Sequence, residues 1–421
     1  MWESSVNLWE SSVKVYSKWV VSVNFGEFLN FRDILSERSV FFNRDALSPH
    51  FLPDKIVHRE KEIERIMRSI TPVFRGKRPR NIFLYGKTGT GKTSSVKYVM
   101  KRFVELPSNG VINYINCRMY NTRYKILQKV STDTIGFSKS GFAPSVFYEK
   151  ILDWIEENNK SLIIVLDEID MIKDLNELVY TLTRANDDLK HGGISMIGIS
   201  NKISFKHQLD SRSKSALLEN EMVFPPYDSD QLREILQQRV QIGFNENACD
   251  PSSINLAAAI AARETGDARY ALKMLLYAGE IADERKENRV THVHVELARK
   301  NVEEDIVMEA VVTLPEHQQL VLYALSTLYA KGSRYSKLTN EPDNLFRSGE
   351  LYETYSEICK KMRREYRSSR WCKEYVRELE ALGLLQTVES GKGMRGHSTL
   401  VKLTYSPEKI KKTVEELMLK I

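Results

Sequence analysis

Cysteine is scarce in this chain. Only four occur among the 421 residues, and none belongs to a CxxC pair. They lie at Cys117, Cys249, Cys359 and Cys372. A disulfide framework and a zinc ribbon both need more cysteines at closer spacing. The sequence therefore excludes both kinds of scaffold, and it favours a reducing, cytosolic setting.

Long apolar runs and a strong charge excess are also lacking. No run approaches the roughly 18 to 20 apolar residues of a membrane span, and the N-terminus lacks the residue order of a signal peptide. We therefore expect no membrane partner. The formal net charge of +6 and the pI of about 8.8 are compatible with nucleic acid without indicating it. With 42% apolar residues, the chain can fill the cores of two or three domains.

The sequence pattern divides the chain into four parts. Residues 1–35 repeat WESSV from Trp2 and from Trp9, and we assign no function to this extension. Residues 36–226 alternate short apolar runs with amphipathic stretches, which predicts an α/β domain with a parallel sheet covered on both faces. Residues 227–308 show only helical periodicity. Residues 309–421 add helices and a hairpin of 385–388 with 401–405, which predicts a winged helix-turn-helix.

The segment after the first expected strand matches a phosphate-binding loop. The clearest strands are Asn81–Tyr85, Val111–Ile115, Leu162–Leu166 and Ser195–Ile199. GKTGTGKT follows the first of them and opens a helix through Ser94 to Arg102, so it fits GxxxxGK[ST] in the required context. Its backbone N–H groups can surround phosphates, the Lys92 ammonium can neutralise their charge, and the Thr93 hydroxyl can bind magnesium. We expect ATP or ADP with Mg²⁺, held by Gly86, Lys87, Thr88, Gly89, Thr90, Gly91, Lys92, Thr93 and Ser94.

Two carboxylates end the third expected strand. Asp167 and Glu168 follow the run LIIVL, and side chains at the carboxyl end of a parallel strand face the nucleotide crevice. A carboxylate pair in this place is often only a solvated strand end. Here the phosphate-binding loop earlier in the chain favours a role in metal binding and nucleotide hydrolysis. Asp167 would hold the metal ion together with Thr93, and Glu168 would polarise an attacking water as the general base.

Three further residues are candidates for the same site. Asn201 follows the fourth expected strand, where it either orients the attacking water or only forms a turn. Arg212 and Arg269 are candidate cations for the γ-phosphate, because a guanidinium grips phosphate oxygens with two donors and keeps its charge. Most arginines are merely solvated, so only the position of Arg212 and Arg269 in the fold can show whether they contact the nucleotide.

Taken in order, these motifs resemble the AAA+ ATPases and, more narrowly, the archaeal origin-recognition initiators. The resemblance runs from about Val40 to the C-terminus, and it includes LPDKIVHRE at 52–60 and GDARYAL at 266–272. It implies an AAA+ domain, a helical lid and a winged helix. It also implies that Asn201 is a sensor, that Arg212 reaches a neighbouring subunit's nucleotide, and that Arg269 senses the nucleotide from the lid. The nucleotide's other contacts would be Val57, His58, Arg59 and Tyr227. Ser211 departs from the family, which usually has proline before the arginine.

Cations are concentrated in the last part of the chain. Residues 309–421 hold 19 Lys or Arg against 15 Asp or Glu, which is +4 of the chain's +6. Ser368 and Ser369 can cap a helix whose expected buried face is Trp371, Tyr375, Val376, Leu379 and Leu382. Expected DNA contacts on this helix are Ser368, Ser369, Arg370, Lys373 and Arg377, and those on the wing are Lys392 and Arg395. The sequence does not show which of Arg370, Lys373 and Arg377 contacts a base.

A segment between the two nucleotide motifs offers one more DNA contact. By the resemblance, residues 131–145 fall where the initiators carry a DNA-contacting helical insertion, with Lys139 as the cation. A packing helix is the alternative interpretation.

The leading hypothesis is an ATP-dependent replication initiator, a slow ATPase used as a switch. It would bind double-stranded origin DNA through the winged helix and the insertion, and help to recruit the replicative helicase, with paralogous initiator subunits as further partners. It would act in the cytoplasm, on the nucleoid. One alternative is a nucleotide-gated transcription regulator of the same architecture. Another is a motor or clamp-loader ATPase whose tail contacts only proteins.

Overall fold

The computed structural model describes residues 38–138, 141–202, 204–205, 209–217, 220–332, 345–389 and 399–418. The WESSV extension and three predicted DNA contacts, Lys139, Lys392 and Arg395, lie outside these residues. None of the helices within the described ranges combines the length and the apolar character that a bilayer crossing needs.

A five-stranded parallel sheet forms the centre of the first domain. Its strand order is β2-β3-β4-β1-β5, and its bounds are β1 Ile82–Tyr85, β2 Gly110–Asn116, β3 Ser161–Asp167, β4 Gly193–Ser200 and β5 Glu221–Val223. The register pairs Asn116 with Asp167 and Asp167 with Ile199, so three strands end at one edge. The four predicted strands are confirmed. The sequence did not predict β5, because three residues without an apolar run give no signal.

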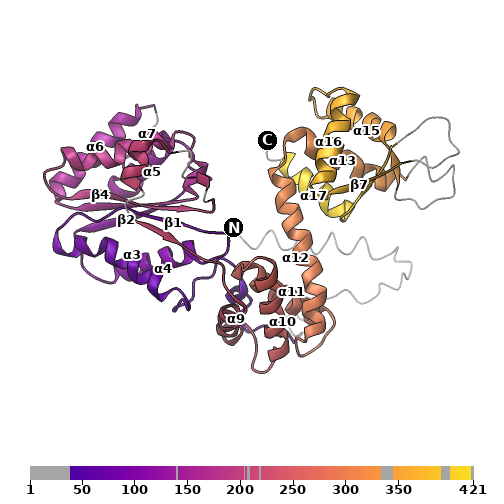
Figure 1. The fold of residues 1–421 in the computed structure, drawn as a ribbon, viewed down its shortest axis with the longest axis horizontal. Helices are drawn as coiled ribbons and strands as arrows, with labels where there is room; N and C mark the ends of the chain where they lie inside the picture. The colour runs from indigo at the N-terminus through magenta and orange to yellow at the C-terminus, as the bar shows by residue number, and fades with distance from the viewer. Residues whose placement is uncertain are drawn as a thin grey trace, which may run out of the picture. The chain divides into compact units, whose positions relative to one another are not determined.

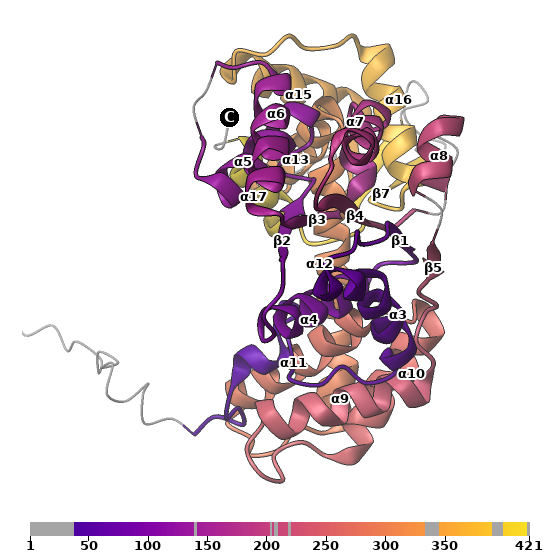
Figure 2. The ribbon, with the colours of Figure 1, turned by 90° about the vertical axis from the view of Figure 1, so that its left-hand side faces the viewer.

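Helices cover both faces of this sheet, as Figures 1 and 2 show. Strand β3 is buried throughout, and its alternate side chains enter two cores: Leu162, Ile164 and Leu166 pack with α5, α6 and α7, whereas Ile163 and Val165 pack with α3 and α4. The helices of this domain are α3 Glu60–Ile70, α4 Lys92–Val104, α5 Arg123–Ile135, α6 Pro144–Asn158, α7 Leu175–Asp188 and α8 Ser211–Leu217. Short 3-10 turns are η2 Arg44–Leu47, η3 Thr71–Arg75 and η4 Ile169–Met171.

The expected helix over residues 131–145 is wrong. Helix α5 ends at Ile135, where Gly136 takes the left-handed conformation with φ 78°. Helix α6 then begins with Pro144 at its first position. Glycine after a helix and proline at a helix start are common terminators and initiators, so the helical residues described in this segment are the end of α5 and the start of α6.

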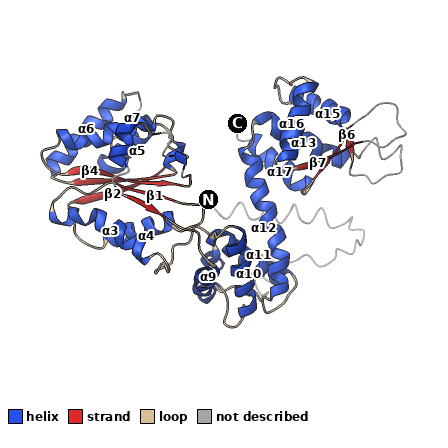
Figure 3. Ribbon diagram, in the orientation of Figure 1, coloured by secondary structure: helices blue, strands red, loops and turns tan. Residues whose placement is uncertain are grey.

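Residues 229–313 contain only helices, which Figure 3 shows in blue. They are α9 Ser229–Gly243, α10 Pro251–Glu264, α11 Ala268–Glu284 and α12 His292–Thr313. Aspartates start three of them: Asp228 forms a capping box with Gln231, and the carboxylates of Asp250 and Asp267 accept backbone N–H groups of α10 and α11. Two residues near the start of the described chain, Val40 and Leu47, also pack within this helical core.

Among the described residues after 313, the order is helix, strand, helix, helix, hairpin, helix. Its elements are α13 Glu316–Lys331, β6 Phe346–Arg347, α15 Ser348–Lys361, α16 Ser369–Ala381, β7 Leu385–Glu389, β8 Thr399–Leu403 and α17 Pro407–Met418. The three strands pair antiparallel in the order β6-β8-β7. One apolar core joins the helices to the sheet. This order is that of a winged helix, with α16 as the second helix of the helix-turn-helix.

The buried face of α16 differs from the expected one. Cys372, Val376 and Leu379 are buried, whereas Trp371 is 55% exposed and Leu382 is 60% exposed. The apolar spacing alone predicts that Trp371 is buried. The neighbouring helices instead cover a face of α16 that begins one residue later, at Cys372. Ser368 does occupy the N-cap position, yet its side chain makes no capping hydrogen bond, so the expected serine cap is wrong.

Gly198 of β4 provides a test of this packing. A Cβ there would lie 2.9 Å from the Phe83 ring and 3.2 Å from Ile169 Cδ1, both fully buried. We expect Gly198→Ala to lower the free energy of unfolding of the full chain in urea by about 1–3 kcal/mol, because the core is overpacked. The control is Gly349→Ala in α15, where a Cβ meets nothing within 4 Å. Equal stability of the two variants would contradict the packing described for β4.

Candidate nucleotide site and DNA interface

The phosphate-binding loop joins β1 to α4, and Lys92 lies buried at its centre. Lys92 Nζ donates to the carbonyl oxygens of Gly86 at 2.9 Å and Lys87 at 2.7 Å. Burial, and next the charge of Arg269, lower the pKa of Lys92 to about 8. The ammonium is thus held inside the loop, with a cation from the helical domain close enough to influence it.

Two glycines of the loop are required by their surroundings. Gly89 and Gly91 have φ values of +70° and +91°, which residues with a side chain rarely adopt. A Cβ on Gly89 would overlap the Asp267 carboxylate, and one on Gly91 would lie 2.5 Å from Tyr227 Oη. The N–H of Ala268 also donates to the Gly89 carbonyl at 3.2 Å. The start of α11 therefore contacts the loop directly.

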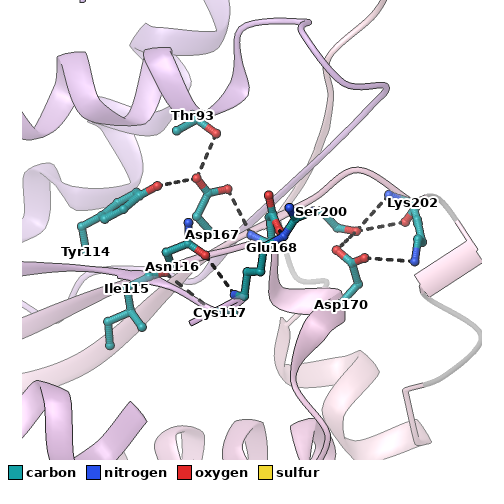
Figure 4. A network of polar contacts seen from close by, with 11 residues as sticks. Thr93, Tyr114, Ile115, Asn116, Cys117, Asp167, Glu168, Asp170, Ser200 and Lys202 are labelled. Atoms are coloured by element: carbon teal, nitrogen blue, oxygen red, sulfur yellow. Dashed lines mark hydrogen bonds and ion pairs between the residues drawn. The ribbon is translucent and has the colours of Figure 1, made fainter. Parts of the chain in front are cut away.

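Asp167 lies at the end of β3 with two hydroxyl groups beside it (Figure 4). Thr93 Oγ1 donates to Asp167 Oδ2 at 3.0 Å, and Tyr114 Oη donates to the same oxygen at 2.5 Å. Burial, and then the bond to Asp167, raise the pKa of Tyr114 well above its usual value, so it remains a donor. A carboxylate beside a hydroxyl at the mouth of the loop is a donor set that suits Mg²⁺. The sequence missed Tyr114.

Glu168, the next residue, has a left-handed backbone with φ 56°. Such a conformation costs of order 1–3 kcal/mol in a residue other than glycine and is concentrated at functional sites. The Glu168 carboxylate accepts from Arg118 Nε at 3.0 Å, and the Arg118 side chain is 68% exposed. Adjacent carboxylates therefore have separate partners. The sequence also missed Arg118, whose only signal is its position just beyond β2.

Asn201 follows β4 and is flanked by two residues that Asp170 holds. Ser200 Oγ donates to Asp170 Oδ1 at 2.9 Å, and Lys202 Nζ lies 3.5 Å from Asp170 Oδ2 (Figure 4). The Asp170 side chain is almost completely buried. This contact positions the backbone on both sides of Asn201, whose side chain stays exposed toward the cavity.

A cavity of about 250 Å³ brings most of the predicted site together. Its lining comes from the loop, from the ends of the strands, from the segment before α3 and from the helical domain. The predicted residues among its lining are Val57, Gly89, Gly91, Lys92, Thr93, Ser94, Asp167, Glu168, Asn201, Tyr227 and Arg269. Gly86, Lys87, Thr88 and Thr90 complete the loop behind them, with Thr90 fully buried.

Three predicted residues lie elsewhere. His58 Nε2 is 2.9 Å from Glu234 of α9. The exposed Arg212 lines a second hollow with Tyr180 and Arg184 of α7. Arg59 lies beneath the loop and is only 2% exposed.

Arg59 ties the loop to the exit of the sheet. Its Nε donates to the Thr90 carbonyl at 2.9 Å, and its Nη2 donates to the Pro225 carbonyl at 2.6 Å. The guanidinium carbon also lies 4.0 Å from the centre of the Tyr227 ring. A buried cation needs such partners, and a planar guanidinium can satisfy two carbonyls and a ring at once. These contacts give Arg59 a role in positioning the loop, and the direct nucleotide contact that the resemblance implied stays a prediction.

Three predicted DNA contacts lie on the exposed part of α16. Arg370, Lys373 and Arg377 are all exposed, and Arg377 Nη1 lies 3.4 Å from Glu374. Ser368 and Ser369 are exposed at the start of the helix.

The turn before α16 is held by a polar network that the sequence did not predict. Arg367 Nε donates to His317 Nε2 at 3.3 Å, so this nitrogen carries no hydrogen, and His317 Nδ1 donates to Tyr355 Oη at 2.8 Å. The Arg367 backbone N–H donates to the same Tyr355 oxygen at 3.1 Å. Burial, and then Arg367, lower the pKa of His317 below its usual 6.5. His317 is therefore neutral in this network.

These features define a class of protein: a P-loop ATPase of the AAA+ type joined to a winged helix. Residues 75–209 match the family described as AAA domain, residues 233–300 the Cdc6 AAA+ ATPase-type lid domain, and residues 309–413 the CDC6 C-terminal winged helix domain. The predicted fold class is confirmed.

Relatives narrow the class to one family. The chain is 36% identical to the ORC1-type DNA replication protein 1 of Archaeoglobus fulgidus over 92% of this chain and 93% of that protein. It is 38% identical to the ORC1-type DNA replication protein of Pyrococcus furiosus over 90% and 91%. This chain belongs to the archaeal ORC1-type family of DNA replication proteins, which are AAA+ ATPases, and the resemblance stated from the motifs is confirmed.

Solved structures agree with this assignment. The Aeropyrum pernix ORC1 protein in complex with DNA superposes with a TM-score of 0.68 at 34% identity, covering 90% of this chain and 98% of that one. Cdc6p from Pyrobaculum aerophilum, at 21% identity and a TM-score of 0.57, has the same fold.

The role of Arg59 can be tested without nucleotide. We expect Arg59→Met to lower the free energy of unfolding by roughly 3 kcal/mol in the nucleotide-free chain, because three hydrogen bonds from a buried cation and its ion pair with Glu62 are lost. The control is Arg68→Met in α3, the helix that Arg59 precedes, and the Arg68 side chain is 77% exposed. Urea unfolding and ATP titration of both variants give the answer. Unchanged stability with lost ATP binding would instead make Arg59 a nucleotide ligand.

The neutral state of His317 predicts a pH dependence. Below pH 6.5 the unfolded chain binds a proton that the folded network rejects, so the stability that His317 contributes is complete above pH 6.5 and falls as the pH drops below it. We therefore expect the difference in thermal unfolding between wild type and His317→Gln to be largest near pH 7.5 and to shrink toward pH 5. A difference that stays constant over this range would rule out the neutral network.

Proposed function

We propose that this chain is an ATP-dependent replication initiator that binds origin duplex DNA and helps to recruit the replicative helicase. The single observation that supports this most is one cavity lined jointly by the phosphate-binding loop, the strand-end carboxylates and Arg269 of the helical domain, in a chain that also carries a winged helix. A nucleotide there would contact two domains at once. Its γ-phosphate can therefore influence how the helical domain sits on the loop.

The chemistry of the proposed ATPase follows from the positions of the side chains. Thr93 and Asp167 would hold Mg²⁺, which supplies charge neutralisation for the β and γ phosphates. Lys92 binds the phosphate oxygens from inside the loop, and Asn201 orients the attacking water. Glu168 acts as the general base after its ion pair with Arg118 opens and the carboxylate is free to contact the attacking water.

Slow turnover fits this arrangement. The Glu168 carboxylate must give up its ion pair with Arg118 before each reaction, and Asp267 must accommodate phosphates near Gly89. Arg269 would report the nucleotide state to its own helical domain. The exposed Arg212, outside this cavity lining, would reach the nucleotide of a neighbouring paralogous subunit. We infer a switch that changes state with hydrolysis.

The proposed parts of the chain keep the bounds that the sequence pattern predicts. Residues 36–226 would bind nucleotide, residues 227–308 would form the lid, and residues 309–421 would bind DNA. The residues that would contact the duplex are Ser368, Ser369, Arg370, Lys373 and Arg377 at α16, Lys392 and Arg395 on the wing, and Lys139 of the insertion. The Aeropyrum pernix ORC1 protein was solved in complex with DNA, and its extensive similarity to this chain supports the same kind of partner here.

A salt titration of DNA binding tests the proposal. With ATP bound, the full chain should prefer origin-flanking duplex to a scrambled duplex of the same length, and removing one phosphate-binding cation should lower the salt slope by about one. Lys92→Ala should abolish ATP binding, and Glu168→Gln should retain binding but block hydrolysis.

Three outcomes would contradict the proposal. Equal affinity for origin-flanking and scrambled duplex at every salt concentration would remove origin recognition. Normal hydrolysis by Glu168→Gln would remove the general base. Occupancy in cells at promoters instead of replication start sites would favour a transcription regulator.

A further inference from the structure

The first turn of α16 presents a large aromatic side chain to solvent. Trp371 is 55% exposed, although the next residue, Cys372, is buried in the core. A tryptophan contributes much apolar surface, and its only polar group is the indole N–H. A core role therefore does not explain this side chain.

Trp371 belongs to a row of three stacked rings, which we call the aromatic ladder: Trp371, Tyr375 and His317. The Trp371 and Tyr375 ring centres are 6.1 Å apart with planes at 30°, and those of Tyr375 and His317 are 6.0 Å apart with planes at 4°. His317 belongs to α13 and is itself fixed by Tyr355 and Arg367. The exposed indole is thus supported from the domain core.

The charges around the ladder show what kind of partner suits it. Arg370 and Lys373 flank Trp371 on α16 and are exposed, and the exposed Arg367 precedes the helix. Such cations suit a polyanion, whereas the indole between them offers an apolar contact. In the major groove of DNA, the apolar feature of the base edges is the thymine methyl group. Side chains in the first turns of a recognition helix are those that reach base edges.

We propose that Trp371 makes an apolar contact with a thymine methyl group in the major groove, and that Tyr375 and His317 hold the indole in place for it. This inference rests on the proposed function, namely that the winged helix binds duplex DNA. Trp371 would then contribute to sequence preference, while the neighbouring cations contribute affinity for phosphates. Preorganisation by the ladder reduces the entropy lost when the side chain is fixed on DNA.

Removal of single methyl groups from DNA tests the contact. Preferred duplexes are first selected from a random pool with the full-length protein and ATP. Each thymine is then replaced by deoxyuracil, which removes only the methyl group. We expect one or two thymines in the site to show a loss of roughly fourfold in affinity, the effect of one buried methyl group. Trp371→Ala should bind more weakly, show no such loss at those positions, and keep the wild-type salt slope.

Matched variants separate the roles of ring and charge. Lys373→Ala should lower the salt slope by about one and keep the sensitivity to deoxyuracil. Tyr375→Ala, which removes the support of the ring, should reduce the sensitivity to deoxyuracil, and Trp371→Phe should keep part of it. Circular dichroism of each variant confirms that the fold is retained.

The inference and the proposed function fail in different ways. If Trp371→Ala shows the same deoxyuracil profile as wild type, the methyl contact is overturned, whatever the total affinity does. A Trp371 contact with sugars would give this result. If Arg370→Ala and Lys373→Ala both leave affinity and salt slope unchanged, α16 does not bind DNA and the proposed function itself fails.

Discussion

The nucleotide half of the molecule depends on the buried guanidinium of Arg59. It joins the start of α3 to the phosphate-binding loop through Thr90 and to the exit of the sheet through Pro225, with Tyr227 stacked against it. A buried cation that lost these partners would cost several kcal/mol. Loop, sheet exit and the approach to the helical domain must therefore assemble together. The Tyr227 hydroxyl also fills the space next to Gly91, so the loop is held at Gly91 as well as at Thr90.

The register of the parallel sheet decides which side chains lie together beside the phosphate-binding loop. It brings the ends of β2, β3 and β4 to one edge, where Asp167 meets Thr93 and Tyr114. The left-handed backbone at Glu168 then turns the next carboxylate toward Arg118. Two adjacent acids thus acquire different partners, hydroxyl groups for Asp167 and a guanidinium for Glu168. The left-handed backbone of Glu168 is a strained conformation for a residue other than glycine.

The winged helix uses charge and apolar surface for different purposes. Its net charge of +4 is modest for 113 residues, but the exposed cations of α16 lie beside an aromatic ladder that reaches back into the domain. The neutral His317 connects the ladder to the turn before α16 through Arg367. The turn before α16 and the ladder on this helix therefore depend on the protonation state of a half-buried side chain at the start of α13.

The sequence by itself determined what is local: the phosphate-binding loop, the four longer strands, Asp167 and Glu168, Asn201, and the order of the three folded parts. These follow from spacing within a few residues, because a loop motif and an apolar run carry their own geometry. Tertiary structure alone decided that Arg59 supports the loop, that Tyr114 and Arg118 join the site, and that Trp371 faces solvent. Each of these depends on which distant segment covers a given face. Helical spacing shows that one face of α16 is apolar, but the position of α13 decides how much of that face is buried.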